Sequence, residues 1–434
     1  MSILPSISMK MQEILQKEAK ASAEENGLIQ RRGGKVTGEN LAQTLIFGWW
    51  QEPEASLDEL CGMGAAVGLD ISVQGLNQRW NKRTADFLAG LLSRMASNQV
   101  AGEDVDQTVL NRFTHVYLED SSIVALSDEL EEQWRGCGGH GPDSAVKLQT
   151  RLELRRGQLD GPHLVDGRVH DRLASEAHPT VEAGALRITD LGFWKLSEWE
   201  QARSTESYWL SRLKSSTHFF VKQQEWTAAD WCYQLKGDEF EVEILLGKVA
   251  QVPVRLIGRR VPAEVSAVRR RKLKRAAQKR GQTLSESRLA LADWTLFVTN
   301  APVSLLSADE VFILYRCRWQ IELLFKLWKS HGHIDKSRSE NAWRQLCELY
   351  AKLIAMLLQQ WIFSGAIWRF HNRSWVRAAR IVRSHVIRLA IAIQQPSSLS
   401  DVLFSIRDIL SKGCRINKSL KQPRSFQLLL ALEA

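Results

Sequence analysis

One stretch of the sequence, from Leu314 to Ser330, constrains the fold of this chain more than any other. It reads LYRCRWQIELLFKLWKS and contains neither proline nor glycine, so it is predicted to form a helix. Successive residues of a helix turn by about 100°, which places Tyr315, Arg318, Glu322 and Lys329 within about 60° of one edge. The apolar residues predicted to face the core are Ile313, Ile321, Leu324, Leu327 and Trp328. The polar edge is either a solvated face with ordinary intrahelical ion pairs or part of a functional site.

The spacing of the four polar residues matches a known family signature. Tyr315, two residues, Arg318, three residues, Glu322, six residues and Lys329 reproduce the pattern Y-(2)-R-(3)-E-(6)-K. In this the chain resembles the insertion-sequence type 4 family of bacterial DDE transposases. The resemblance implies that Glu322 is the third metal-binding carboxylate of an RNase H-like catalytic core. It also implies that Tyr315, Arg318 and Lys329 hold the phosphates of a transposon end near the cut.

Two aspartates upstream lie at the ends of predicted strands. The segment Phe113–Asp120 alternates and then becomes acidic, and Ser121–Leu126 either continue this strand or turn away from it. Ala185–Asp190 is a later strand that runs into a glycine-containing turn. By itself, an aspartate in such a place is more often a turn former or a helix cap than a metal ligand. The resemblance implies instead that Asp120 and Asp190 are the first two carboxylates of the catalytic site.

Three carboxylates would supply the oxygen ligands that Mg²⁺ and Mn²⁺ prefer. We therefore expect Mg²⁺ as the cofactor, with Mn²⁺ as a substitute, at Asp120, Asp190 and Glu322. Two such ions about 4 Å apart can activate a water or a 3′-hydroxyl and stabilise the leaving oxygen of a phosphoryl transfer. The resemblance implies a first nick, a hairpin intermediate at the transposon end, and strand transfer into target DNA.

Further DNA contacts are predicted upstream of the helix. The resemblance implies a tryptophan that stacks on an unpaired base, and Trp294 lies where that tryptophan is expected. Trp226 and Trp231 are alternatives, and Trp294 could equally pack beneath its own strand. Arg212 and Lys214 are candidates for contacts with the DNA backbone, or else ordinary surface charges.

The charge of the chain favours an anionic partner, with nucleic acid first. The net charge is +9. The segment from Val254 to Arg280 contains eleven Arg or Lys residues and a single acid, Glu264. A second segment, from Arg369 to Arg388, contains six arginines and no acid. Each basic segment is either a solvated helix face or a surface for DNA phosphates.

A segment near the N-terminus is predicted to form a helix-turn-helix. A capping box at Ser56 begins one helix, and after a tight turn Ser72 begins another. The polar residues expected on the second helix are Gln74, Asn77, Gln78, Arg79 and Lys82. Gln, Asn and Arg suit base edges in a major groove, so Gln74, Asn77 and Arg79 are candidate DNA-reading residues. A generic helix hairpin is the alternative.

The predicted fold class is α/β, an RNase H-like mixed sheet flanked by helices, with an inserted β-rich domain and helical terminal regions. The predicted divisions are a helical DNA-binding region (1–105), the first part of the catalytic core (106–222), a β-rich insertion with a basic helix (223–300), the second part of the core (301–345), and a helical C-terminal region (346–434). The insertion would explain why Glu322 comes so late after Asp190.

Composition and motifs limit where the protein is expected to act and which other functions stay possible. The six cysteines form no CxxC pair, and the sequence shows neither a secretory signal nor a run of about 18 apolar residues. We expect a protein of the bacterial cytoplasm, associated with the nucleoid and without a membrane partner. Its expected partners are double-stranded DNA, both terminal repeats and target, and by resemblance a second copy in a homodimer. The alternatives are a catalytically inactive DNA-binding regulator and a metal-dependent nuclease without strand transfer.

Overall fold

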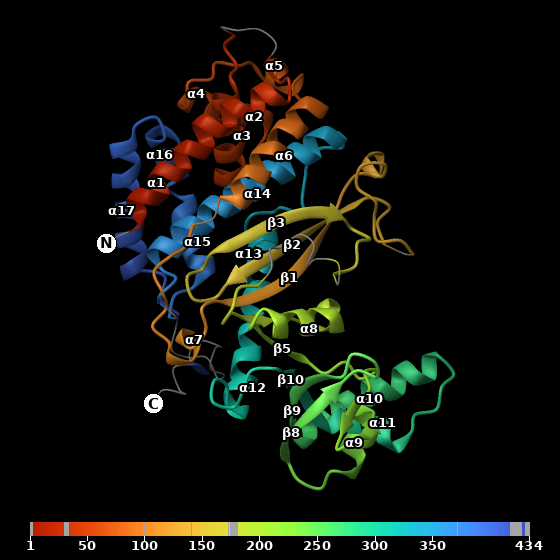
Figure 1. Ribbon diagram of the computed structural model, residues 1–434. Coiled ribbons are helices and arrows are strands. Elements are labelled where there is room, and N and C mark those ends of the chain that lie inside the picture. Colours follow the sequence, from red (N-terminus) through yellow and green to blue (C-terminus); the bar gives the residue numbers. More distant parts are fainter. Residues whose placement is uncertain are drawn as a thin grey trace. The chain divides into compact units, whose positions relative to one another are not determined.

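The computed structural model describes residues 3–29, 34–98, 100–139, 141–171, 173, 181–370, 372–416 and 428–429. The chain divides into two compact units (Figure 1). Unit 1 comprises Met1–Asp106, Asp120–Val169 and Gln320–Pro423, and unit 2 comprises Gln107–Glu119, His170–Trp319 and Arg424–Ala434. Both units join segments from several of the predicted domains, whose boundaries stay a prediction.

Unit 1 is built around α14 (Ala342–Ala366), against which the N-terminal helices α1, α3 and α6 and the C-terminal α17 pack (Figure 1). Asn341 caps it by accepting a hydrogen bond from the Arg344 amide. Its helices are α1 (Leu4–Gln12), η1 (Glu13–Glu18), α2 (Ala19–Glu25), α3 (Gly38–Gln51), α4 (Leu57–Ala66), α5 (Val73–Asn77), α6 (Lys82–Ser97), η2 (Asp128–Leu130), α13 (Trp319–Ser330), α14, α15 (Trp375–Arg383), α16 (Val386–Ala392) and α17 (Pro396–Lys412).

By length and composition α14 could cross a membrane, but its apolar stretch is entirely buried inside the protein, as in a core helix. Its one buried ion pair joins Lys352 to Glu348, 3.3 Å apart. The Lys352 ammonium also donates to the carbonyl oxygens of His333 and Lys336, at 3.2 and 2.7 Å. These bonds fasten the loop after α13 onto α14.

A single mixed sheet runs through the fold in the strand order β3-β2-β1-β4-β5-β10-β9-β8-β6-β7. The strands are β1 (Val116–Ala125), β2 (Ala145–Glu153), β3 (Leu159–Asp166), β4 (Leu186–Ile188), β5 (Tyr208–Arg212), β6 (Phe219–Val221), β7 (Gln224–Trp226), β8 (Glu239–Leu246), β9 (Val252–Arg260) and β10 (Trp294–Thr299). The start of β1 belongs to unit 2 and pairs in parallel with β4, and β4 pairs in parallel with β5. The end of β1 belongs to unit 1, where β2 and β3 form an antiparallel pair.

Most of the antiparallel part of unit 2 lies in the predicted insertion (223–300), although β5 and β6 precede it. There β10 pairs with both β5 and β9, and β9 pairs with β8. Tryptophans and aliphatic residues from these strands form one apolar cluster. The helices of unit 2 are α7 (Thr108–Asn111), η4 (Leu191–Phe193), α8 (Leu196–Ser204), α9 (Ala228–Gln234), α10 (Ala263–Lys279), α11 (Glu286–Ala290), η5 (Leu291–Asp293) and α12 (Ala308–Cys317). The mixed α/β architecture confirms the predicted fold class.

The predicted second helix of the helix-turn-helix is wrong in length. The helix that Ser72 caps, α5, ends at Asn77 after five residues. Asn81 begins α6 by accepting a hydrogen bond from the Thr84 amide, and the Thr84 hydroxyl donates to the Arg79 carbonyl. These local bonds compete with continuation of α5. Lys82, predicted on the second helix, is therefore the first residue of α6.

Candidate active site

In unit 1, Asp120 lies in the middle of β1, so its predicted place at the end of a strand is wrong. Of the two alternatives for the residues that follow, continuation of the strand is the one observed. Residues 121–125 extend the strand, because the two serines after Asp120 lead into the β-branched Ile123 and Val124. The Ser121 amide donates to one Asp120 carboxylate oxygen at 2.8 Å. Asp120 is half-buried, so its carboxylate is oriented by the backbone and still reaches solvent.

The predicted helix from Leu314 to Ser330 is two helices, α12 and α13, that meet at Arg318. There the amide donates to the Tyr315 carbonyl at 3.2 Å, an i to i−3 bond that tightens the helix for one turn. The predicted core face is buried at Ile321, Leu324, Leu327 and Trp328, while Ile313 is only half-buried. The Tyr and Arg of the signature therefore fall in unit 2, and the Glu and Lys in unit 1.

Lys329 ties α13 to the strand that carries Asp120. Its ammonium donates to the Ile123 carbonyl oxygen at 2.9 Å. Glu322 lies in the first turn of the same helix and is half-buried. A lysine ammonium has three N–H donors, so the bond to Ile123 leaves it capacity for a phosphate oxygen.

In unit 2, Asp190 follows β4 by two residues and caps η4. One of its carboxylate oxygens accepts the Gly192 amide at 2.7 Å. The aspartate is thus the helix cap that residue statistics favour, and its carboxylate is held in one orientation by that bond. Capping and metal binding are compatible, because each carboxylate oxygen can accept more than one partner.

Tyr315 brings together the predicted phosphate contacts of unit 2. Burial raises the pKa of its hydroxyl, the positive charges of Arg318 and Arg212 oppose that rise, and the Asp190 carboxylate adds to it. The Arg318 guanidinium hydrogen-bonds to the tyrosine and lies 5.9 Å from its ring centroid. Tyr315 also packs on Phe297, with the ring centroids 4.6 Å apart. Two cationic side chains therefore lie close to Tyr315, an arrangement that suits DNA phosphates.

Trp294 is placed on the other face of β10. Its ring is only 3% exposed, packs edge-on to Phe240 at 5.3 Å, and has the Arg260 guanidinium 4.8 Å from its centroid. Strand residues alternate between faces, so Trp294 points away from the side on which Phe297 meets Tyr315. Stacking of Trp294 on a DNA base stays a prediction, and it requires the ring to leave this cluster. The alternatives Trp226 and Trp231 pack against each other in the same cluster, 5.4 Å apart.

The remaining predicted DNA contacts lie at the surface and stay predictions. Lys214 is exposed just after β5. Gln74 and Asn77 are exposed on the short α5, and Arg79 is half-buried in the turn that follows. These residues are available to a partner, but a five-residue helix offers a much smaller surface than the predicted recognition helix.

The second basic segment is partly used inside the protein. The side chains of Arg373, Arg377 and Arg383 donate to the carbonyl oxygens of Ser411, Arg415 and His331, respectively. Arg380 and Arg388 are exposed. Arg369 pairs with Glu103 at 2.6 Å. Four of the six predicted DNA-facing arginines therefore join parts of unit 1 to one another.

A buried ion network in unit 2 was missed from the sequence. Arg187 of β4 is 5% exposed, donates to Glu119 at 2.7 Å and to Glu198 at 2.5 Å, and lies over the Trp209 ring at 4.2 Å. Burial opposes its charge, but the two glutamates outweigh burial and keep the pKa of Arg187 above its ordinary value. Glu119 immediately precedes Asp120. The only sign of it in the sequence was that Tyr117 and Glu119, two residues apart on a predicted strand, would place two polar groups on the same face.

Two arginines of β9 hold the start of α12, and this too was missed. The buried Arg255 donates to the carbonyl oxygens of Ala301 and Leu306, at 2.7 and 2.8 Å. Arg259 pairs with Asp309 at 2.5 Å and lies over the Phe312 ring. The insertion strands therefore position the helix that carries Tyr315. No periodicity in the sequence predicts which carbonyls an arginine will meet.

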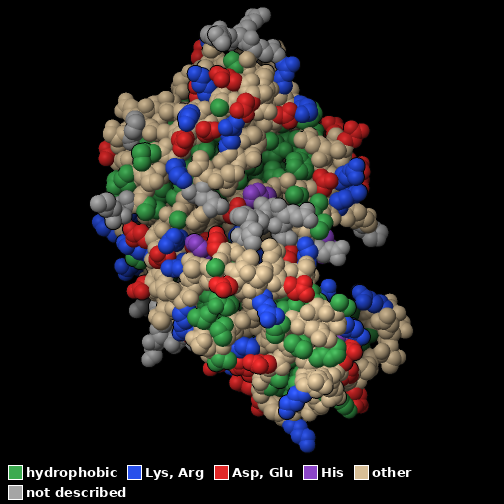
Figure 2. Space-filling model, in the orientation of Figure 1, with side chains coloured by type: hydrophobic (Ala, Val, Ile, Leu, Met, Phe, Trp, Pro, Cys, Tyr) green, Lys and Arg blue, Asp and Glu red, His purple; other side chains and the backbone are tan. Residues whose placement is uncertain are grey.

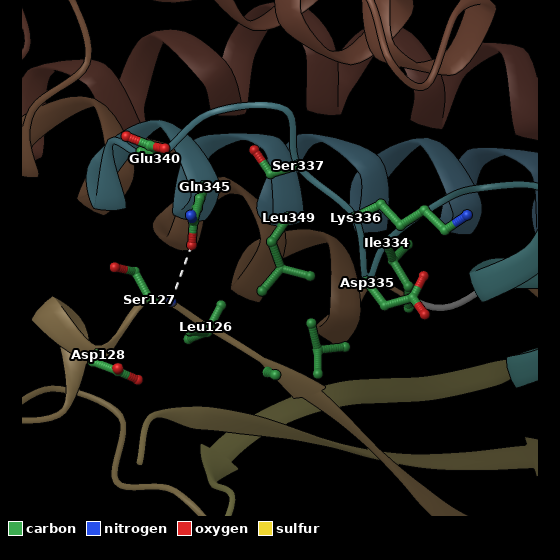
Figure 3. Close-up of a pocket in the computed structure, with 12 residues that line it drawn as sticks. Leu126, Ser127, Asp128, Ile334, Asp335, Lys336, Ser337, Glu340, Gln345 and Leu349 are labelled. Atoms are coloured by element: carbon green, nitrogen blue, oxygen red, sulfur yellow. Dashed lines mark hydrogen bonds between the residues drawn. The ribbon is translucent and has the colours of Figure 1, made fainter. Parts of the chain in front are cut away.

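Among the residues that the structure describes, no group of three or more His, Cys, Asp or Glu side chains is arranged to hold a metal ion. Figure 3 shows a pocket of about 470 Å³ in unit 1, between the end of β1 and the loop that joins α13 to α14. The Ser127 amide donates across it to the Gln345 side chain at 3.0 Å. Its charged lining is Asp128, Asp335, Glu340 and Lys336. This mainly acidic pocket does not suit a phosphate.

A comparison of the sequence with known families decides the identity. The profile of a family described as "Transposase DDE domain" matches residues 111–358, more than half of the chain. The chain belongs to the DDE transposases. The matched region includes Asp120, Asp190 and Glu322 together with the complete Y-(2)-R-(3)-E-(6)-K signature. The mixed sheet is accordingly that of an RNase H-like transposase domain with helical flanks.

Named relatives extend this likeness over most of the chain. A transposase for insertion sequence element IS231F from Bacillus thuringiensis subsp. israelensis is 27% identical over 432 residues, which cover 92% of this chain and 89% of the relative. A transposase for IS1151 from Clostridium perfringens is 24% identical over 362 residues, covering 78% and 76%. A putative transposase InsL for IS186A from Escherichia coli K12 is 33% identical over 128 residues, covering 28% and 35%. The predicted type 4 family is consistent with these names.

The three carboxylates of this transposase fit a divalent metal by their donor chemistry. All are oxygen ligands of the kind that Mg²⁺ and Mn²⁺ prefer, and all three side chains are half-buried, neither sealed in the core nor fully hydrated. Both aspartates have one oxygen oriented by a backbone amide. Such oriented carboxylates lose little freedom when they bind a metal.

Proposed function

We propose that this DDE transposase binds the terminal repeats of its own insertion sequence, cleaves the DNA there, and joins the freed 3′ end to target DNA. The observation that carries the proposal is the family match over residues 111–358, within which all three carboxylates and the four-residue signature are intact. That completeness favours an active enzyme over an inactive DNA-binding relic. The double-stranded DNA ends, paired in a homodimer, are the proposed substrate.

The positions of Asp120 and Glu322 within unit 1 support a shared site. Lys329 contacts the Ile123 carbonyl, so helix and strand are in contact at that point. Glu322 precedes Lys329 by seven residues, or about 10 Å along a helix at 1.5 Å per residue. Asp120 precedes Ile123 by three residues, or about 10 Å along a strand at 3.3 Å per residue. Each carboxylate therefore lies about 10 Å along its own element from the same point of contact.

The residues of the proposed site have two roles in phosphoryl transfer, metal binding and phosphate binding. Mg²⁺, or Mn²⁺ in its place, would be held by Asp120, Asp190 and Glu322. When bound, such ions supply activation of the attacking oxygen and stabilisation of the leaving oxygen. Arg318 offers a planar guanidinium for phosphate oxygens, and Tyr315 with its raised pKa keeps its hydroxyl proton for donation. A hairpin intermediate would follow if the first freed 3′-hydroxyl attacks the opposite strand.

Replacing Arg318 with alanine is expected to weaken binding of terminal-repeat DNA by roughly 10- to 100-fold, because a hydrogen bond to a charged group contributes about 1.5–3 kcal/mol. The slope of log K against log salt should also fall in magnitude by about 0.9, the value for one phosphate contact. Both quantities are measured by fluorescence anisotropy without divalent metal. Arg316→Ala is the matched control, since Arg316 is exposed two positions away. Equal losses in the two variants would refute the assignment.

A strand-transfer assay separates the proposal from its alternatives. Purified protein, labelled terminal-repeat DNA, Mg²⁺ and a supercoiled plasmid are incubated together, and the label is followed into the plasmid. A transposase joins the 3′ end of the labelled DNA to the plasmid. Cleavage without joining would identify a nuclease, and binding without cleavage would identify an inactive regulator.

We place the protein in the bacterial cytoplasm with the nucleoid, in keeping with its DNA substrate and with six free thiols.

A further inference from the structure

Helix α10 of unit 2 is anchored through two of its arginines. Arg269 donates to the Trp294 carbonyl at 2.8 Å and to the Thr295 hydroxyl at 3.1 Å. Arg270 holds both carboxylate oxygens of Asp293, at 2.9 and 2.5 Å. These bonds, together with the partly buried Leu273 and the buried Ala277, fix the side of α10 that faces the protein.

The other side of α10 carries an unusual surplus of positive charge. Its exposed cations are Arg271, Lys272, Lys274, Arg275 and Lys279, the last residue of the helix, and Arg280 follows them directly. None of these six has an ion-pair partner within the part of the chain that the structure describes. Like charges four residues apart, as at Arg271 and Arg275, destabilise a helix. Within the described residues no acid offsets this repulsion, so an external anion would relieve it.

The charged helix continues the electropositive region around Tyr315. Thr295, which Arg269 contacts, is two residues from Phe297 on β10 and so lies on the same strand face. Phe297 packs on Tyr315 and pairs across the sheet with Arg212. Burial and the charge of Arg212 both lower the pKa of Arg269, as expected for neighbouring cations. One strand face therefore links α10 to the predicted phosphate contacts.

We propose that the outer side of α10 binds the sugar-phosphate backbone of transposon-end duplex DNA that extends beyond the Tyr315 region. This inference rests on the proposed function, because it takes terminal-repeat DNA as the partner. The charge of the surface is complementary to that polymer, and Figure 2 shows Lys and Arg side chains along the edge of the molecule where α10 lies in Figure 1.

The length of the row of cations on α10 determines how many base pairs of DNA it should contact. From Arg271 to Arg280 the chain advances by about 14 Å at 1.5 Å per residue. DNA advances by about 3.4 Å per nucleotide of each strand, so the cations span roughly four base pairs. Such contacts carry no sequence information, and they fix the position and register of the DNA end.

The test compares two double variants of the full chain that remove the same charge. Arg271→Gln/Arg275→Gln removes two cations from the outer side of α10, and Lys222→Gln/Lys236→Gln removes two exposed cations elsewhere in unit 2. Affinity for a terminal-repeat duplex is measured without divalent metal over a range of salt. The α10 variant should lower the magnitude of the salt slope by about 1.8, or 0.9 per lost phosphate contact. The Lys222/Lys236 variant should change it by much less.

Two further arms separate the outcomes. Arg271→Lys/Arg275→Lys keeps the charge and should retain the parental slope. In hydroxyl-radical footprinting, Arg271→Gln/Arg275→Gln alone should lose the protection of about two base pairs, because the two arginines are about 6 Å apart along the helix. An unchanged slope, equal changes in both glutamine variants, or a change confined to unrelated duplex DNA would overturn the proposal. The assay contains no metal, so it is independent of cleavage: wild-type protein that binds but does not cut would contradict the proposed function and leave this inference standing.

Discussion

Each of the variants Asp120→Asn, Asp190→Asn and Glu322→Gln is expected to reduce cleavage of terminal-repeat DNA by at least about 1000-fold. A metal that polarises a phosphoryl oxygen supplies several kcal/mol of transition-state stabilisation, and about 4 kcal/mol corresponds to roughly 1000-fold in rate. The amide keeps the shape of the carboxylate and removes its charge. All three half-buried side chains can be changed in this way without creating a cavity.

The cleavage measurement needs two kinds of control. Asp335→Asn and Glu340→Gln remove exposed carboxylates from the loop after α13, in the pocket of Figure 3, and should leave the cleavage rate unchanged. Binding of terminal-repeat DNA without metal should be preserved in all the variants, which separates loss of chemistry from loss of folding. Near-normal cleavage by any one of the three site variants would remove that residue from the site.

Arg187→Ala is expected to destabilise the protein by about 3–5 kcal/mol, because it leaves two buried carboxylates without their partner. Glu119 is completely buried and Glu198 is 7% exposed, so neither can be rehydrated without opening the structure. The loss is measured from the urea unfolding midpoint, followed by circular dichroism. Because Glu119 precedes Asp120 and Arg187 precedes Asp190 by three residues, cleavage should also fall in protein that is still folded.

Two comparisons show whether this effect arises from burial of charge. Arg407→Ala removes an arginine from a partly exposed pair with Asp408, and should cost less than about 1 kcal/mol. Replacing Arg187, Glu119 and Glu198 together with methionine or leucine should recover much of the lost stability, since a buried ion network can be exchanged for apolar side chains at little cost. An Arg187→Ala variant as stable as Arg407→Ala would contradict this account of the network.

The regular elements were predictable wherever one periodicity governed a segment. The buried α14 and the strands of the insertion follow from apolar pattern alone. The predicted ends of helices were wrong where local hydrogen bonds compete with continuation of the helix. Asn81 caps α6, so α5 is shorter than predicted, and the bond from the Arg318 amide to the Tyr315 carbonyl divides the predicted signature helix in two. The sequence left open whether residues 121–126 continue the strand of Asp120 or turn away from it, and in the structure β1 continues to Ala125.

The sequence indicated which residues belong to the candidate site, but not which neighbouring groups they contact. Spacing and family resemblance pointed to Glu322 and its signature partners, and Tyr315 and Arg318 do lie together beside the charges of Arg212 and Asp190. The sequence could not show that Lys329 would also bond to the Ile123 carbonyl. Nor could it show that Trp294 would face the apolar cluster, because the face of a strand that becomes buried depends on what packs against it.

The most direct test of the account is an anomalous difference map from crystals of the protein bound to terminal-repeat DNA and Mn²⁺. The account predicts metal peaks within about 2.0–2.6 Å of carboxylate oxygens from Asp120, Asp190 and Glu322, beside the scissile phosphate. Metal bound elsewhere, or a site from which one of these three carboxylates is absent, would contradict the central claim that they form one catalytic centre.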